Sequence, residues 1–262
     1  MTHENLATYR WQADPVRTPI LDVIVTPITA SEVVNLIHEP ATSVSTILNH
    51  NLHSAYLYRK HAWFRDLYAD ADVVAIDGWP VLKLAGVRKR GGLKTSHRIG
   101  STDWIEVLKE KASDGPGLRV FLFGGAPESN AEAVRQLSRG GAGLDVRGHD
   151  GYVNPNEWQR VIDQIEEFQP QLVLLGMGMP LQEQFLSSHS GRLPHAHYAT
   201  VGGAIDYVAG FQRLSPRIFG SLGIEWLWRL ANDPRRLFAR YCVEPLLLLG
   251  LIARDSLRKK GA

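Results

Sequence analysis

Apolar residues recur along the chain in short continuous blocks, and segments with helical spacing separate these blocks. Such blocks, bounded by turn residues, are typical of buried strands. Strands of this kind divided by helices of about 10–15 residues indicate a parallel sheet that helices cover on both faces. We expect strands at residues 20–28, 43–49, 72–77, 119–124, 144–149, 171–178 and 197–202.

The intervening segments place apolar residues at helical spacing. Ser31 is the expected N-cap of the first helix, with Val33, Val34 and Ile37 on one face. Residues 54–70 are expected to form one continuous helix. Further helices are expected at 80–87, 102–113, 128–139, 155–169 and 180–189.

From about residue 213 the pattern changes to helix alone, and Asp233-Pro234 provides an N-cap followed by proline at the first helical position. The expected fold class is therefore α/β. A Rossmann-like parallel-sheet core, residues 1–212, has two halves that meet near 88–102. A helical C-terminal appendage, residues 213–262, follows it.

Composition excludes several classes of protein. The chain has 262 residues, 44% of them hydrophobic, which is ample for a globular core. The single cysteine, Cys242, cannot form an internal disulfide. The polar N-terminus does not resemble a signal peptide, and no run reaches the ~18–20 apolar residues of a membrane-spanning helix. We therefore expect a cytoplasmic protein.

Positive charge is concentrated in the appendage. From Asp206 onward the chain has ten Lys and Arg against five acids, whereas its overall net charge is only +2. Arginines alternate there with aromatic residues, and the apolar run PLLLLGLIA and a basic end follow. This pattern favours a segment that lies in a membrane interface with its cations on headgroups or on a diphosphate. A solvated basic face over a core-facing stripe is the simpler alternative. Nucleic acid is disfavoured because the basic patch is small and the remainder is acidic.

Polar and glycine residues follow several of the expected strands, where ligands bind in open α/β sheets. Gly124-Gly125 precedes a helix and suits close approach of a phosphate or ribose, although Gly-Gly is also plain turn chemistry. After Gly176 and Gly178, Gln182 and Glu183 stand in the first turn of a helix, where they can bind a ligand or cap the helix.

The motifs of dehydrogenases, P-loop NTPases and α/β-hydrolases are absent from the sequence. A metal site is not supported either. Asp70-Ala71-Asp72 precedes a strand rather than following one, so we interpret it as a helix end. His50 and His53 have no nearby carboxylate or third ligand in the sequence. No cofactor is expected.

Asp77 ends the apolar strand VVAID and begins the turn Asp77-Gly78. Asp-Gly is a common turn pair, so the carboxylate can be purely structural. At the mouth of a buried strand it can equally serve as a general base. Both interpretations remain open on the residues alone.

The chain contains seven motifs in order: IDGWPV, Arg98-x-x-x-x-Asp103, FLFGG, GHDGYV, LLGMGMPLQEQF, VGGAIDYVAG, and R-x-S-P-R followed by IEWLWRLANDPRR. Together they resemble the WecG/TagA/CpsF family of bacterial glycosyltransferases, over roughly residues 20–245. The resemblance implies transfer of a sugar from a UDP-sugar to a polyprenyl-diphosphate-linked saccharide, with inversion, at the cytoplasmic membrane face and without an obligatory metal.

The resemblance also implies roles for individual residues. Asp77 corresponds to the proposed catalytic base. The family has T-x-N at the second strand, where this chain has Thr46-Ile-Leu-Asn49. The implied substrate-binding residues are Thr46, Asn49, Arg98, Asp103, Gln182 and Glu183; those for UDP are Gly124, Gly125, Tyr152, Gly176, Gly178 and Asp206; those for the diphosphate and membrane are Arg229, Arg236 and Arg240.

The sequence thus predicts an inverting, membrane-associated glycosyltransferase of surface polysaccharide synthesis. UDP-glucose is the favoured donor, followed by UDP-N-acetylmannosamine and its uronic acid. The alternative is an inactive, membrane-docked scaffold that binds sugar nucleotides. A homo-oligomer is compatible with the apolar appendage, which can pack on a second subunit as well as on lipid.

Overall fold

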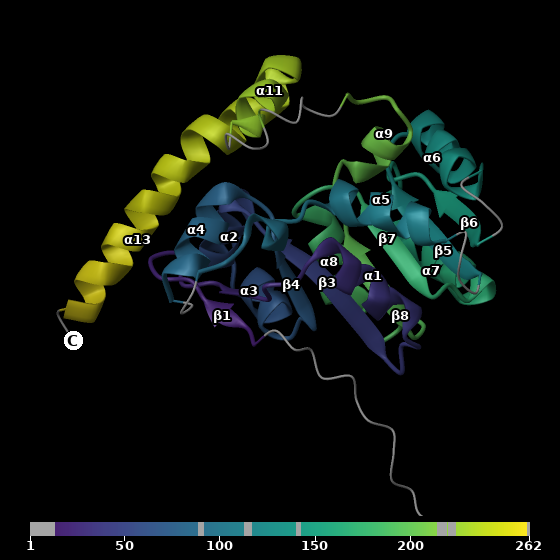
Figure 1. Ribbon diagram of the computed structural model, residues 1–262, viewed down its shortest axis with the longest axis horizontal. Helices are drawn as coiled ribbons and strands as arrows, with labels where there is room; N and C mark the ends of the chain where they lie inside the picture. Colours follow the sequence, from purple (N-terminus) through teal and green to yellow (C-terminus); the bar gives the residue numbers. More distant parts are fainter. Residues whose placement is uncertain are drawn as a thin grey trace, which may run out of the picture.

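A six-stranded parallel sheet forms the centre of the computed structural model (Figure 1). Across the sheet the strands lie in the order β4 (Val73–Ile76), β3 (Val44–His50), β8 (Ala196–Thr200), β7 (Leu172–Gly176), β5 (Leu118–Gly124) and β6 (Leu144–His149). The α/β class is confirmed. The structure describes residues 14–88, 92–112, 117–139, 143–213, 219 and 224–260, without the side chains of 88, 236 and 258–260.

Helices cover both faces of the sheet, and each face has its own apolar core. Strands β5, β7 and β8 are buried almost throughout because they contribute side chains to both cores. One face carries α2 (Leu52–Lys60), α3 (Ala62–Ala69), α4 (Trp79–Arg88), α7 (Trp158–Phe168) and α8 (Leu181–His189). The other carries α1 (Ala30–His38), α5 (Ser101–Lys111), α6 (Pro127–Arg139) and α9 (Ala204–Val208).

Two local predictions differ from the structure. Thr29, not Ser31, caps α1, because the Thr29 hydroxyl accepts a bond from the Glu32 amide while the Glu32 carboxylate accepts one from the Thr29 amide. Residues 54–70 form two helices rather than one. His61 adopts an extended conformation between α2 and α3, and the break lets α3 bury Phe64 and Tyr68.

Residues 20–28 contribute only a short strand, which lies outside the main sheet. β2 (Ile24–Val25) pairs antiparallel with β1 (Val16–Arg17). The turn between them contains Ile20 and Asp22 with positive φ, so this segment folds back on itself instead of extending beside β4. The Thr26 amide still donates to the Val74 carbonyl, which fastens the hairpin to the sheet edge.

The appendage continues through α11 (Glu225–Asn232), α12 (Pro234–Phe238), the π-helical turn η3 (Ala239–Val243) and α13 (Glu244–Lys260). In Figure 1, α13 is the long yellow helix at one edge of the core, and it packs on α2. His53 contacts Glu244, and Arg59 contacts Asp255 at 2.7 Å. Leu248 is buried between these two contacts.

The outer face of α13 is apolar and exposed. Leu246, Leu249 and Leu257 recur there at helical spacing, with side chains 68%, 59% and 72% exposed. We call the side chains Val243, Leu246, Leu247, Leu249 and Leu257 the outer stripe. In the part of the chain that the structure describes, every helix falls short of the length or hydropathy needed to cross a bilayer.

Candidate functional site

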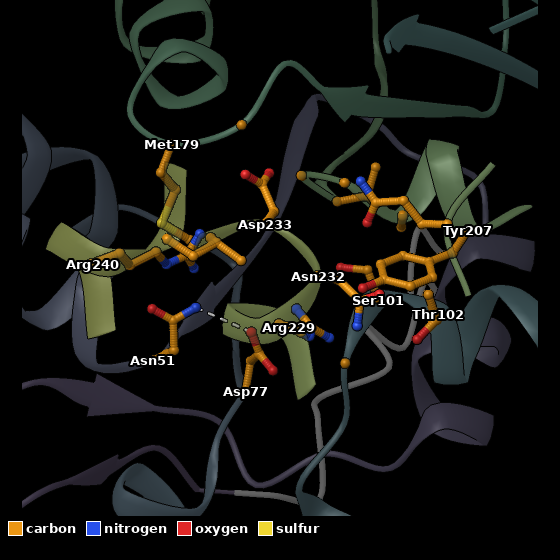
Figure 2. Close-up of a pocket in the computed structure, with 18 of the residues that line it drawn as sticks. Asn51, Asp77, Ser101, Thr102, Met179, Tyr207, Arg229, Asn232, Asp233 and Arg240 are labelled. Atoms are coloured by element: carbon orange, nitrogen blue, oxygen red, sulfur yellow. Dashed lines mark hydrogen bonds between the residues drawn. The ribbon is translucent and has the colours of Figure 1, made fainter. Parts of the chain in front are cut away.

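Two clefts meet at Asp77, at the carboxyl end of the sheet. The first, of about 580 Å³, lies between strand ends of the core and the appendage (Figure 2). The second, of about 970 Å³, lies between α4, α5, α9 and α11. Asp77 therefore borders two separate volumes. The residues common to both clefts are Asp77, Gly100, Thr102, Tyr207 and Arg229.

The local fold holds Asp77 at this meeting point. β4 is buried along its whole length, so the carboxylate is carried to the edge of the core before the chain turns at Gly78. The Asp77 amide donates to the His50 carbonyl at 2.9 Å, and Gly78 has a φ of 122° that disfavours any side chain. The turn that the Asp77-Gly78 pair suggested is thus present, and it directs the Asp77 carboxylate toward both clefts.

Asn51 fixes the orientation of that carboxylate. Its Nδ2 donates to Oδ2 of Asp77 at 3.1 Å, and its Oδ1 accepts from the Ser54 amide at 3.1 Å as the N-cap of α2. One face of the carboxylate is therefore occupied, whereas Oδ1 is directed toward the Gly100 side. The sequence contains a signal for Asn51 that the motif comparison did not use. Asn49 and Asn51 have the two-residue spacing of the family motif T-x-N, and both line the first cleft.

Thr46 lies elsewhere in the fold. It is in the first half of β3, about 10 Å from Asn49 by strand geometry. Its amide donates to Asp72 at 2.8 Å, which ties the start of β3 to the segment before β4. Asn49, at the other end of the strand, donates to the Thr200 carbonyl at 2.9 Å and so joins β3 to β8 at the floor of the first cleft.

The segment after η1 (Thr95–His97) brings Arg98 and Asp103 to the second cleft. The Ile99 amide donates to the Ile76 carbonyl at 2.9 Å, which extends the sheet edge by one bridge beside Asp77. Arg98 lies 5.6 Å from the Trp79 ring centroid. Asp103 accepts from the Gly100 amide at 2.7 Å, and burial raises the pKa of its carboxyl.

Gln182 and Glu183 form a buried polar pair at the start of α8. Gln182 lies in the wall of the first cleft, accepts from the Gly202 amide at 3.0 Å and donates to Glu183 at 2.8 Å. Glu183 is fully buried beneath it, and its Oε2 has no hydrogen-bond partner among the described residues. Burial raises the pKa of Glu183 to about 7. The pair therefore fixes the amide orientation of Gln182.

Packing explains three of the glycines selected for UDP. A side chain at Gly124 would place its Cβ 2.3 Å from the Gly176 carbonyl carbon, and one at Gly176 would meet Ile205 at 2.4 Å. The Gly125 amide donates to the Gly176 carbonyl at 3.2 Å. Gly178, with a φ of 80° and open space around it, lines the first cleft.

Tyr152 and Asp206 lie outside both clefts. The Tyr152 side chain is 82% exposed. Asp206 accepts from the Ser129 hydroxyl at 2.6 Å, which joins α9 to α6. Its neighbour Tyr207 borders both clefts, so α9 reaches from this region to Asp77.

Arg229 and Arg240 bring positive charge from the appendage into the first cleft (Figure 2). In Figure 2, Arg229 lies beside Asp77 while Arg240 reaches in from the side of Met179 and Asn51. Nearby Glu225, Tyr207 and Asp77 raise the pKa of Arg229 despite its burial, so its guanidinium is charged. The side chain of Arg236 lies outside the described residues.

The two histidines considered for metal binding have separate partners. His50 stacks on Tyr68, with its Nδ1 2.9 Å from the Ser54 hydroxyl, and burial lowers its pKa to about 3. His53 does have a carboxylate neighbour, Glu244, which is distant in the sequence. Among the described residues, groups of three or more His, Cys, Asp and Glu that could hold a metal do not occur.

Several cleft residues were not anticipated from the sequence. Their signals were weak, because each is an ordinary polar residue at a helix end or in a loop. They come from α5, α9 and the appendage, segments far apart in the chain: Ser101, Thr102, Tyr207, Asn232, Asp233 and Tyr241.

The geometry joins a carboxylate, two clefts and appendage arginines, and all of these lie within the residues that a family model matches. The model of the family described as "Glycosyl transferase WecG/TagA/CpsF family" matches residues 18–262. This match includes the appendage as well as the sheet. The chain therefore belongs to the WecG/TagA/CpsF family and is a glycosyltransferase of cell-surface polysaccharide synthesis.

Proposed function

We propose that the protein transfers a sugar from a UDP-sugar, with inversion, to a polyprenyl-diphosphate-linked saccharide at the inner face of the cell membrane. UDP-glucose is our preferred donor, with UDP-N-acetylmannosamine and its uronic acid next. The observation that carries the proposal is the position of Asp77 between two clefts. A two-substrate displacement needs a base where an acceptor hydroxyl and a donor carbon meet.

In the proposed mechanism, Oδ1 of Asp77 takes the proton of the acceptor hydroxyl. The hydroxyl oxygen attacks the anomeric carbon from the side opposite UDP, a C–O bond forms, and the bond to the β-phosphate of UDP breaks with inversion. Asn51 keeps Oδ2 engaged, so the carboxylate cannot rotate away from the hydroxyl. Arg229 and Arg240 supply positive charge for phosphate oxygens.

We place the donor along the strand ends of the first cleft. Asn49, Gln182 and Gly178 would contact the sugar and diphosphate, since all three line that cleft. Gly124, Gly125 and Gly176 would shape the backbone approach to UDP. Tyr152 and Asp206 remain our proposed contacts for uridine and ribose, and exposed Tyr152 is available for stacking. Thr46 has no place in this arrangement because its partner is Asp72.

We place the acceptor's lipid on the side of the appendage. The outer stripe would lie in the membrane interface and the basic residues would meet headgroups. In the second cleft, Arg98 would contact the diphosphate of the acceptor and Asp103 its saccharide. This arrangement brings a membrane-bound acceptor to Asp77 and needs no membrane-spanning helix from the described residues.

The test is a panel of UDP-sugars with a polyprenyl-diphosphate-sugar acceptor, with UDP release and product stereochemistry as readouts. Asp77→Asn keeps the shape and the Asn51 contact but removes the base, so turnover should fall by about 10²–10⁴-fold with donor binding retained. Donor binding without turnover in the wild-type protein would support the inactive scaffold instead. Full turnover by Asp77→Asn would refute the role of Asp77 as base.

A further inference from the structure

Glu225 lies where the core and the appendage each bring an arginine toward Asp77. Its Oε1 accepts hydrogen bonds from Nε of Arg229, at 3.0 Å, and from Nη2 of the same guanidinium. Its Oε2 is 3.8 Å from Nη1 of Arg98. The side chain is 26% exposed and lines the second cleft. One carboxylate thus holds two of the cations that the proposed function assigns to substrates.

The charges around Glu225 are out of balance. Asp77, Asp103 and Glu225 are three carboxylates that interact with the two guanidinium groups of Arg98 and Arg229. Burial raises the pKa of Asp103, and the charges of Asp77 and Glu225 raise it further, against the lowering effect of Arg98 and of the Gly100 amide. On the side of the second cleft, a diphosphate that approaches Asp77 therefore meets these carboxylates unless Arg98 and Arg229 turn from Glu225 to the phosphate.

Carboxylate and phosphate compete for the same edge of an arginine. The guanidinium fork pairs with either group through two parallel N–H···O bonds, and Glu225 already accepts from the Nε–Nη2 edge of Arg229. We propose that Glu225 is an internal competitor of the substrate's phosphate, which must displace it from Arg229 and Arg98. That these arginines meet a phosphate rests on the proposed function.

Displacement has a consequence for ligand choice. A phosphate can replace the charge of Glu225 at both arginines, whereas a neutral sugar or nucleoside cannot. Glu225 would therefore reject uncharged fragments from the arginine site and weaken phosphate binding by a fixed factor. Since the Arg98 contact joins α11 to the segment after η1, displacement would also release one tie between the appendage and the core.

A purely structural role makes the opposite prediction. A carboxylate in the first turn of α11 compensates the helix dipole, and its bonds hold Arg229 in place. If that were its only role, removing the charge would leave phosphate affinity unchanged or would weaken it, because Arg229 would become less ordered. The sign of the change in affinity thus separates the two roles.

The experiment measures binding of inorganic pyrophosphate, UDP and uridine to the full chain by titration calorimetry. In Glu225→Gln and Glu225→Ala, pyrophosphate and UDP should bind about two- to fivefold more tightly than in the wild-type protein, the effect of removing a partly exposed ion pair. Uridine affinity should not change. Glu167→Gln, an equal charge change on exposed α7, should match the wild-type protein for all three ligands.

Equal or weaker pyrophosphate binding in both Glu225 variants would overturn the proposal, as would a failure of pyrophosphate to bind at all. Thermal unfolding of each variant shows whether the fold is intact, and agreement between Gln and Ala excludes an effect of one replacement side chain. Sugar transfer by the wild-type protein is measured separately. Turnover with unchanged pyrophosphate affinity refutes the role of Glu225 alone and leaves the proposed function standing.

Discussion

At the scale of single residues, Asn51 combines two tasks that mutation can separate. Its Oδ1 caps α2 and its Nδ2 holds Asp77. Aspartate caps a helix as well as asparagine does, but here it would place a second carboxylate against Asp77. Asn51→Asp should therefore fold normally and shift the acid limb of the pH profile of kcat/KM to higher pH, because the two carboxylates would share a proton.

The rate at pH 7 should fall about tenfold in this variant. Asn51→Ala serves as the control, because it loses the cap, about 1 kcal/mol of stability, without adding a charge. It also loses the hydrogen bond to Asp77, so its acid limb should move less than that of Asn51→Asp, which adds a like charge as well. An unshifted profile in Asn51→Asp would show that Asn51 does not control the reactive carboxylate.

Glu183 predicts how stability depends on pH. Burial raises its pKa from 4.5 to about 7 in the folded protein. Between these values the folded protein binds more protons than the unfolded chain, so the free energy of unfolding falls as the pH rises through about 7. Glu183→Gln removes this loss and keeps an acceptor for Gln182, and should be more stable than the wild-type protein at pH 8 by about 2–3 kcal/mol.

Urea denaturation at pH 5 and pH 8 measures this difference. At pH 5 Glu183 is protonated in most molecules of the wild-type protein. The wild-type protein and Glu183→Gln should therefore have similar free energies of unfolding at that pH. If the wild-type protein and Glu183→Gln differ in free energy of unfolding by the same amount at pH 5 and at pH 8, Glu183 does not titrate in the way its burial implies.

At the scale of elements, the ends of β5 and β7 approach so closely that they exclude side chains. Gly124 has a φ of 145°, and an added Cβ would lie 2.3 Å from backbone. Gly124→Ala should lower the free energy of unfolding by about 3 kcal/mol or more. Gly191→Ala, at a site with open space, is the matched control and should change stability little. Equal denaturation midpoints for the two variants would contradict this account.

The strands were the elements most easily predicted from the sequence. The long-range contacts between their ends and other segments were the hardest to predict. Buried parallel strands such as β4 and β7 are continuous apolar runs that the sequence displays directly. The bridge from Ile76 to Arg98 and the bond from Asn51 to Asp77 join segments about twenty residues apart or more, which periodicity does not specify. The resemblance implies Thr46 by its place on the second strand, whereas the two-residue spacing of T-x-N occurs at Asn49 and Asn51, which both line the first cleft.

Helix boundaries illustrate the same limit. Thr29 and Ser31 are both acceptable N-caps by residue type, and only the reciprocal bonds with Glu32 decide between them. No proline or glycine marks the break at His61 in the sequence. It depends instead on the packing of α3, which local sequence does not contain.

At the scale of the whole molecule, the outer stripe can be tested apart from the catalytic site. Truncation before Asp233 should abolish liposome binding, but it also removes Arg240 and Tyr241 from the first cleft. Leu246→Glu with Leu249→Glu changes only exposed side chains. This variant should lose about tenfold or more in affinity for anionic vesicles in a sedimentation assay, while turnover of a short-chain acceptor in detergent persists.

A charge-matched control is Gln159→Glu with Gln164→Glu, two exposed positions on α7. It adds the same charge away from the outer stripe and should bind vesicles like the wild-type protein. Unchanged sedimentation of the Leu246 and Leu249 variant would refute the membrane role of the stripe and direct attention to a second subunit as its partner.

The two polar contacts between α2 and α13 also fix the angle of α13 on the core. His53–Glu244 and Arg59–Asp255 are eleven residues apart along α13, about three turns, so the helix can neither roll nor slide while both persist. One residue inserted after Leu249 would rotate the rest of α13 by about 100° and set the two pairs against each other. The two contacts therefore fix the angle between the first cleft and any surface that the outer stripe contacts.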